Sequence, residues 1–343
     1  MRLYPYLRPF LFALDAETAH RATIAALKFL PLHSAHLPPS LSTSVAGLQF
    51  PSPVGLAAGF DKDAEVAAEM LTLGFGFVEV GTLTPRPQAG NSKPRLFRLA
   101  TDEAVINRMG FNNAGQAAAF MRLKSCSRAG GPIGVNIGAN KDSPDFVGDY
   151  VAGVKAMSSV ADYLTVNISS PNTPGLRALQ NHGALFTLLS AVREARQGEG
   201  PPLFLKVAPD LESRDPLHIV RAAIDNKVDA IIVSNTTVSR PPLTSLHSGE
   251  QGGLSGAPLK PLALEALRQF RSASGGQIPL IGCGGITDAG DAWERICAGA
   301  SLVQLYTAMV YEGPHIARRI AEGLARKLAR SDFGSIAEAV GSR

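Results

Sequence analysis

Hydroxyl and amide side chains gather in one short stretch of the chain, VNISSPNTPGLR (166–177), directly after an apolar run. Such groups bind polar ligands through hydrogen bonds, whereas a serine acts as a base only with a dry pocket, a proton acceptor or a water relay. On chemistry alone, ligand binding is the commoner role for Ser170, and proton transfer is the less common one. Pro171 and Pro174 restrict the backbone around it. The stretch therefore indicates a rigid polar site at the end of a buried strand.

Two lysines are further candidates for chemistry. Lys206 lies inside the apolar run LFLKV (203–207). A buried ammonium is costly unless an anion pairs with it, so a phosphorylated cofactor or a ring that becomes anionic on reduction would suit this position. Lys62 has a weaker case, because in FDKD it could simply pair with Asp61 or Asp63.

Glycine-rich segments predict a phosphate site. GGLSG (252–256) and GGI (284–286) each precede a predicted helix, and Thr287 and Asp288 stand at the start of the second one. Glycine lets backbone N–H groups approach an anion closely, and a helix N-terminus adds favourable partial charge. The alternative is that these glycines only form tight turns. Neither segment matches GxGxxG or GxxxxGK[ST], which disfavours a Rossmann or P-loop nucleotide site.

The elements that would position these groups follow a repeating pattern from residue 53 onward. Short apolar or β-branched runs occur at 53–58, 77–81, 133–137, 163–167, 203–207, 230–234, 279–283 and 302–306. Segments with helical periodicity follow most of them, at 62–73, 146–159, 176–196, 216–226, 258–270, 289–298 and 315–327. This alternation predicts an α/β fold, a (β/α)8 TIM barrel in which the chemistry gathers at the carboxyl ends of the strands. An open doubly wound sheet is the alternative.

Two connections and the N-terminal segment depart from the simple repeat. Residues 82–112 contain extended stretches at 95–99 and 104–106 that predict a small hairpin, and residues 235–257 have the composition of a lid or ligand-binding loop. Residues 1–40 predict an α-helical hairpin, with Asp15 as N-cap of a helix that runs to about Leu30. Its apolar face either covers the barrel or lies on a membrane and admits a lipophilic ligand.

Composition excludes several classes of function. The chain has 343 residues, 45% of them hydrophobic, and a mild excess of +4 with no dense Lys/Arg cluster, so we expect no nucleic-acid partner. Three cysteines without CxxC spacing predict neither a disulfide framework nor a zinc site. We expect no metal site, because none of the seven histidines lies at a strand end. No membrane span or secretory signal is expected.

Several motifs together resemble a known family. VNISSPNTPGLR, INRMGFNN, GVNIGANKD, SNTT and GGLSG, with LDAETAHR near the N-terminus, resemble class 2 dihydroorotate dehydrogenases, the membrane-associated, quinone-dependent class. The resemblance covers nearly the whole chain. It implies an FMN-bearing barrel over residues 41–343 that oxidises dihydroorotate to orotate in pyrimidine biosynthesis, and a quinone tunnel formed by residues 1–40. The cytosolic class has cysteine at the position of Ser170, and the cysteines of this chain lie elsewhere. Ser234 departs from the commoner threonine but keeps the hydroxyl.

The resemblance also implies residue roles. Ser170 would be the catalytic base, which takes the C5 proton while the C6 hydride passes to the flavin. FMN would be bound by Ala57, Ala58, Gly59, Phe60, Asp61, Lys62, Thr82, Asn136, Asn167, Lys206, Ser234, Gly256, Gly285, Tyr306 and Thr307. Dihydroorotate would be bound by Lys62, Asn107, Arg108, Met109, Gly110, Phe111, Asn167, Asn172, Asn235 and Thr236. His20 and Arg98 would line the quinone site.

The resemblance also implies a setting: a monomer that contacts the cytoplasmic face of a bacterial inner membrane peripherally, through its N-terminal helices.

Two other functions compete with this interpretation. A different FMN barrel, such as a dihydropyrimidine or dihydrouridine dehydrogenase, would need a nucleotide or iron–sulfur site, and the sequence has neither the fingerprint nor a cysteine cluster. A non-catalytic barrel that binds a phosphorylated ligand is the second alternative.

Overall fold

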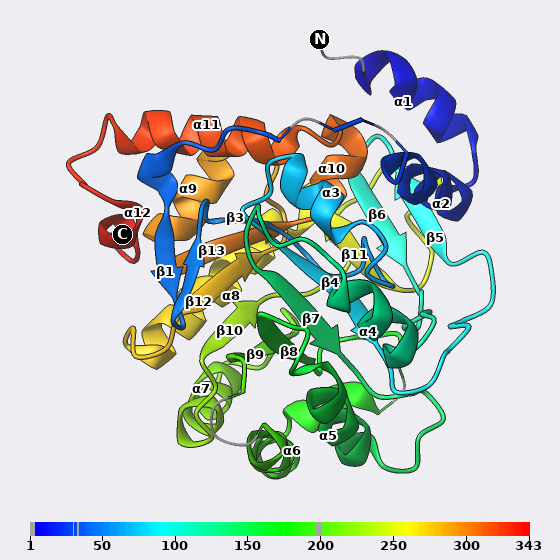
Figure 1. Cartoon of the computed structure of the whole chain (residues 1–343), viewed down its shortest axis with the longest axis vertical. Helices are drawn as coiled ribbons and strands as arrows, with labels where there is room; N and C mark the ends of the chain where they lie inside the picture. Colours follow the sequence, from blue (N-terminus) through cyan, green and yellow to red (C-terminus); the bar gives the residue numbers. More distant parts are fainter. Residues whose placement is uncertain (1–3, 30, 33, 174, 197–199) are drawn as a thin grey trace.

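Eight parallel strands close into a barrel at the centre of the molecule (Figure 1). The computed structural model describes residues 4–29, 31–32, 34–173, 175–196 and 200–343. The barrel strands are β3 (Val54–Leu56), β4 (Phe77–Leu83), β7 (Ile133–Ile137), β8 (Tyr163–Asn167), β9 (Leu203–Val207), β10 (Ala230–Val233), β12 (Leu280–Cys283) and β13 (Ala300–Leu305). They pair in this order, and β13 returns to β3. The predicted (β/α)8 barrel is confirmed, and the open-sheet alternative is wrong.

Helices surround the barrel on the outside (Figure 1). They are α3 (Ala67–Thr72), α4 (Gln116–Lys124), α5 (Phe146–Met157), α6 (His182–Ala195), α7 (Asp215–Asp225), α8 (Lys260–Ser274), α9 (Ala289–Cys297), α10 (Thr307–Glu312), α11 (Ile316–Leu328) and α12 (Ile336–Ala339). Short 3-10 turns are η1 (Pro39–Leu41), η2 (Leu176–Gln180) and η3 (Ala257–Leu259).

Three of the predicted barrel helices differ from the observed ones by four residues or more at one end, and the other barrel helices agree within two residues. The one predicted from residue 62 begins only at Ala67, because the Asp61 carboxylate accepts the backbone N–H groups of Glu65 and Val66 (2.7 and 2.9 Å) and holds the preceding residues in a turn. The helix predicted over 176–196 is divided into η2 and α6 by the extended backbone of Asn181. Helix α8 begins at residue 260 and continues to residue 274, four beyond its predicted end. Helices α4, α10 and α12 were not predicted.

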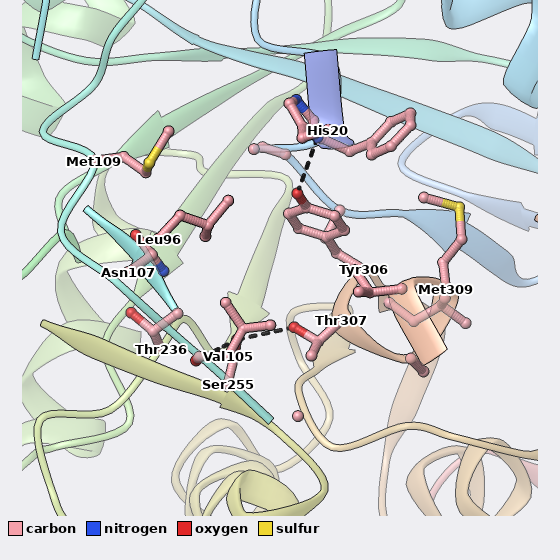
Figure 2. A pocket seen from close by; sticks show the side chains of 18 of the residues that line it. His20, Leu96, Val105, Asn107, Met109, Thr236, Ser255, Tyr306, Thr307 and Met309 are labelled. Atoms are coloured by element: carbon pink, nitrogen blue, oxygen red, sulfur yellow. Dashed lines mark hydrogen bonds between the residues drawn. The ribbon is translucent and has the colours of Figure 1, made fainter. Parts of the chain in front are cut away.

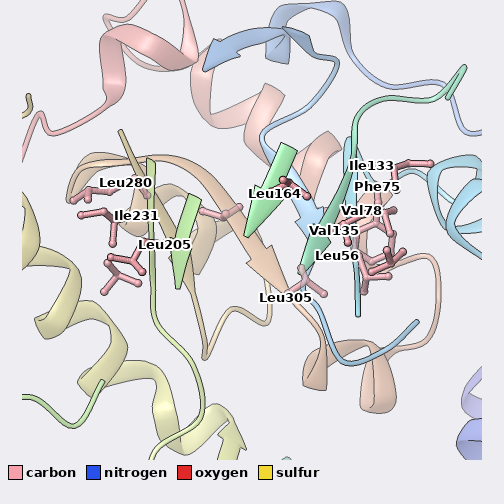
Figure 3. Packing of buried hydrophobic residues seen from close by; sticks show 14 of the residues in the cluster. Leu56, Phe75, Val78, Ile133, Val135, Leu164, Leu205, Ile231, Leu280 and Leu305 are labelled. Carbon is pink, nitrogen blue, oxygen red and sulfur yellow. The ribbon is translucent and has the colours of Figure 1, made fainter. Parts of the chain in front are cut away.

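The strands bury both of their faces. Outward side chains such as Val78, Val135 and Leu205 join the layer beneath the helices (Figure 3). Inward side chains form a second cluster inside the barrel, with Phe77 and Phe204 among its members. Burial on both faces explains why the strands read as continuous apolar runs.

A plug of aromatic rings closes the amino-terminal end of the barrel. The hairpin of β1 (Thr43–Val45) and β2 (Leu48–Phe50) brings Phe50 against Phe77, with ring centroids 5.1 Å apart. Tyr163 stacks on Phe204 at 4.4 Å. Gly134 makes room for this packing, because a Cβ there would lie 2.0 Å from the Tyr163 ring. The barrel is therefore filled at one end, and a cavity is left at the carboxyl ends of the strands.

A three-stranded sheet forms a roof over those carboxyl ends. It consists of β5 (Leu96–Leu99), β6 (Ala104–Asn107) and β11 (Gly253–Gly256), with β6 in the centre. The predicted hairpin over 95–106 is confirmed by the β5–β6 pairing. The segment 235–257, predicted as a lid or ligand-binding loop, contains a strand near its end, because Gly253–Gly256 form β11, in which Leu254 lies opposite Ile106.

The N-terminal segment forms the predicted helical hairpin and packs beside the roof (Figure 1). It consists of α1 (Tyr4–Ala13) and α2 (Ala16–Leu27), and Asp15 caps α2 by accepting the Thr18 N–H at 2.9 Å. Helix α2 ends at residue 27 rather than 30, and residue 30 itself lies outside the described part. Glu17 of α2 accepts two hydrogen bonds from Arg95 at 2.7 and 3.0 Å, and this nearly buried pair holds the hairpin on β5.

Candidate active site

One cavity of about 650 Å³ spans the carboxyl ends of the barrel strands, the roof sheet and the N-terminal hairpin (Figure 2). Most of the sequence-predicted site residues line it. They are Ala57, Ala58, Gly59, Phe60, Lys62, Thr82, Asn167, Lys206, Gly256, Gly285, Tyr306 and Thr307 of the expected cofactor set, Asn107, Met109, Gly110, Phe111, Asn172, Asn235 and Thr236 of the substrate set, and Ser170, His20 and Arg98. Residues from the N-terminal hairpin, the roof sheet and the carboxyl ends of the barrel strands thus meet in one space.

Amide and hydroxyl groups form a continuous network that runs from the cavity floor into the barrel beneath it. Asn167 Nδ2 donates to Thr82 Oγ1 and to Asn136 Oδ1, both at 3.0 Å. Thr82 Oγ1 donates in turn to Asn136 Oδ1 at 2.5 Å. On the other side, Asn167 Oδ1 accepts Ser169 Oγ at 2.8 Å, and Ser169 Oγ accepts Asn235 Nδ2 at 2.7 Å. These bonds fix each amide in one orientation.

The loop that carries Ser170 is held from several directions. Ser170 is buried, and its Oγ accepts the backbone N–H of Asn172 at 3.2 Å. The Asn172 side chain donates to Asn107 O of the roof at 3.2 Å. Arg177 donates to Ser169 O at 3.1 Å and pairs with Asp210 at 3.1 Å. Pro174, which was expected to stiffen this loop, lies outside the described residues.

Two lysines bring positive charge to the cavity wall. Lys206 is only 3% exposed, and none of the ion pairs found in the described part of the chain involves it. Lys62 Nζ donates to Gly59 O at 2.7 Å. Burial lowers the pKa of Lys62 to about 8, although Glu17 and Asp63 oppose the change. Both ammonium groups would gain from an anionic ligand.

Glycine-rich loops line the cavity where β11 and β12 end. Gly256, Gly284 and Gly285 all have positive φ, at 100°, 110° and 68°. A Cβ on Gly285 would lie 2.3 Å from the backbone of Lys260, so only glycine fits this approach. Thr307 stands at the start of α10 and donates to Ser255 Oγ at 2.8 Å. The loops form a cradle of backbone and hydroxyl groups of the kind that binds phosphate.

The other end of the cavity, under the N-terminal hairpin, is apolar and aromatic. Phe60 makes edge-to-face contacts with His20 and Tyr306, with centroids 5.3 and 5.7 Å apart. Tyr306 OH lies 3.4 Å from His20 Nδ1 (Figure 2). Burial lowers the pKa of His20 to about 3 and raises that of Tyr306, so a neutral imidazole faces a neutral phenol. Arg98 donates to Leu11 O and Phe12 O of α1 at 2.9 and 3.2 Å.

Four expected site residues do not line the cavity. Asn136 and Ser234 are fully buried beneath its floor, and Asp61 is buried beside it as the acceptor that holds the turn before α3. The Arg108 side chain points away, because it pairs with Glu250 at 2.7 Å and lies over the Phe97 ring.

Sequence reasoning missed other residues of the wall. They include Leu96, Val105, Leu259, Cys283 and Met309. Ser255, Ile286 and Thr287 also line the cavity, and they belong to the glycine-rich motifs in which the sequence predicted a phosphate site. The missed residues carry no such signal, because their position depends on the roof sheet and on α10.

Comparison with known proteins agrees with this geometry. Residues 40–328 match the family model described as dihydroorotate dehydrogenase. The chain belongs to the dihydroorotate dehydrogenase family. Proteins named dihydroorotate dehydrogenase (quinone) from Erythrobacter litoralis and Novosphingobium aromaticivorans are 63% and 60% identical to it, over 99% and 100% of both chains. The predicted family and its quinone-dependent class are confirmed.

Solved structures of dihydroorotate dehydrogenase have the same fold. A structure of the Eimeria tenella protein, in complex with ferulenol, is 42% identical and superimposes with a TM-score of 0.91 over 95% of each chain.

In this member of the dihydroorotate dehydrogenase family, no helix of the described residues is long and apolar enough to cross a membrane. A search of the same residues finds no group of three or more histidine, cysteine or acidic side chains that could hold a metal ion.

Proposed function

We propose that this protein oxidises dihydroorotate to orotate with FMN as the hydride acceptor and a membrane quinone as the final electron acceptor. The observation that carries the proposal is the single cavity, which is polar beneath the roof and apolar beneath the N-terminal hairpin. A small polar substrate and a lipophilic one can therefore approach the same centre from two sides. The quinone-dependent relatives in the same family support this assignment.

The residues present fit FMN. The cradle of Gly256, Gly284 and Gly285 suits its phosphate, and Lys206, which lacks a carboxylate partner among the described residues, suits a ring that becomes anionic on reduction. A volume of about 650 Å³ lies within the range of ligand sites. Bound FMN would supply hydride acceptance, which no amino-acid side chain offers.

Dihydroorotate would bind beneath the roof. Asn107, Asn172 and Asn235 would hold its polar ring and carboxylate, and Lys62 would pair with its negative charge. Ser170 would remove the C5 proton. The support for this role is its placement, since its loop is buried and is anchored by Asn172 and Arg177, and correct placement of a base matters more than its strength.

The quinone would enter between α1 and α2 and stop near His20 and Arg98. Large apolar side chains are exposed on this hairpin, among them Tyr6 at 76% and Phe10 at 75%. They would rest on the cytoplasmic face of a bacterial inner membrane, so residues 1–40 act as the quinone and membrane segment and residues 41–343 as the catalytic barrel of a monomer. Buried Arg95 and Glu17 would keep the segment aligned with the barrel.

The visible spectrum of the purified protein tests the proposal. Without oxygen, dihydroorotate should bleach a flavin band, and a quinone should restore it. A flavin that bleaches but is not restored by quinone would overturn the role of the N-terminal segment alone. A protein with no flavin, or a flavin that does not respond to dihydroorotate, would overturn the proposed reaction.

A further inference from the structure

A carboxylate lies inside the barrel, one layer below the cavity floor. Glu79 on β4 is fully buried between the aromatic plug and the floor network. Its Oε2 accepts Thr165 Oγ1 at 3.1 Å, Gln304 Nε2 at 3.0 Å and Tyr163 OH at 3.3 Å. Its Oε1 accepts Asn136 Nδ2 at 2.7 Å. Glu79 does not line the cavity, and the reaction proposed above gives it no role.

The four donors make Glu79 an acceptor on every side. In all four bonds a Glu79 oxygen is the acceptor, so each group that faces it presents a hydrogen. This arrangement has a cost at Gln304, because its own Oε1 is buried and has no hydrogen-bond partner among the described residues. A buried acceptor that draws so many donors sets the direction of every bond around it.

We propose that Glu79 is a positioning residue that fixes the orientation of the asparagine amides on the cavity floor. Because Asn136 must give its Nδ2 to Glu79, its Oδ1 is turned toward Thr82 and Asn167. Asn167 then presents Nδ2 to that oxygen and Oδ1 to Ser169, which in turn accepts from Asn235. One carboxylate therefore determines the direction of the hydrogen bonds along four successive polar side chains, of which Asn167 and Asn235 line the cavity. The inference rests on the proposed function for its substrate and cofactor.

A glutamine at position 79 cannot accept hydrogen bonds at both the Oε1 and the Oε2 position, because one of its two terminal atoms is an amide nitrogen that only donates. If its oxygen serves the three donors at the Oε2 position, its nitrogen meets Asn136 Nδ2, and Asn136 must turn over. The turned amide then places Nδ2 against Asn167 Nδ2, which is 3.0 Å from that position. Two donors cannot share this distance, so Asn167 moves at the cavity wall. A displacement of about 1 Å in a reacting site costs roughly 100-fold in rate.

The test is Glu79→Gln in the FMN-loaded enzyme. We expect FMN to remain bound with an altered flavin absorption spectrum, and flavin reduction by dihydroorotate to slow by about 10- to 100-fold. Reoxidation by quinone should stay within about twofold, because the apolar end does not depend on this network. Tyr163→Phe is the matched control, since it removes a donor to the same carboxylate without touching Asn136, and its reduction rate should change less than about threefold.

The outcomes separate the inference from the proposed function. A parent protein whose flavin dihydroorotate does not reduce would refute the proposed function. A parent that is reduced normally, with Glu79→Gln FMN-loaded and equally fast, would refute the inference alone, and so would equal losses in Glu79→Gln and Tyr163→Phe. If Glu79→Gln does not fold, neutron diffraction from the parent decides. Deuterium on the Asn136 atom that faces Glu79, with none on Glu79, supports the inference, and the reverse overturns it.

Discussion

Acidification should loosen the N-terminal hairpin from the barrel through His20. In the docked hairpin the pKa of His20 is lowered to about 3, mainly by burial and then by the nearby charges of Lys62 and Arg21. When α2 leaves the barrel, the ring regains its ordinary pKa of 6.5. The undocked form therefore binds a proton that the docked form does not. The contribution of His20 to the free energy of docking is fully present above pH 6.5, and it is lost progressively as the pH falls toward 3.

The magnitude follows from these two values. At pH 5 the solution lies about 1.5 pH units below the ordinary pKa and well above the lowered one, and each pH unit in that window is worth about 1.36 kcal/mol. Docking should lose about 2 kcal/mol between pH 7 and pH 5, which is roughly a 30-fold rise in the undocked population.

Limited proteolysis of the hairpin measures this population when opening and closing are faster than cleavage. The variant His20→Gln keeps a neutral polar side chain and cannot titrate. With one protease active at both pH values, the ratio of parent to variant cleavage rates should rise about 30-fold from pH 7 to pH 5. His36→Gln, at an exposed position, should behave like the parent. Equal acid sensitivity in the parent and in His20→Gln would refute the reasoning.

Three further predictions concern the two ends of the cavity and the barrel interior. Ser170→Ala should slow flavin reduction by about 10²- to 10⁴-fold while FMN stays bound, and unchanged turnover would contradict its role as the base. Deletion of residues 1–40 should abolish reoxidation by a long-chain quinone but preserve flavin reduction by dihydroorotate; normal turnover in the truncated protein would contradict the tunnel. Gly134→Ala should lower the free energy of unfolding by about 1 to 3 kcal/mol, because its Cβ would meet the Tyr163 ring at 2.0 Å, whereas Gly183→Ala has open space and should not. Equal urea midpoints for the two alanine variants would contradict this.

The barrel was predictable because its strands are buried on both faces and so form short, nearly continuous apolar runs between polar ends. The polar residues at the carboxyl ends of these strands therefore predict where the site lies. Strand β11 was not predictable in the same way. Gly253 and Gly256 contribute no side chains to pack, and the strand exists because its backbone pairs with β6. Periodicity cannot reveal a strand that is specified by its partner.

Some expected site residues do not line the cavity, for a similar reason. Arg108 lies in a motif with cavity residues on either side of it, but its direction is decided by Glu250, which is 142 residues away. Glu79 was missed altogether, because one acidic residue within an apolar strand carries no sign of its partners on three other strands. The types of side chain at the site could be predicted from the sequence, while their orientations depend on contacts between distant strands.

The contact between His20 and Tyr306 joins positions 286 residues apart in the chain. During synthesis, α2 therefore leaves the ribosome long before the surface that receives it has been made. Strand β13, the last in the barrel, ends at residue 305, so the barrel cannot close until almost the whole chain has emerged. Throughout that time the apolar side chains of the hairpin remain uncovered. A nascent chain is thus exposed to aggregation at its N-terminus, and a chaperone or a nearby bilayer that covers these side chains would protect it until the barrel is complete.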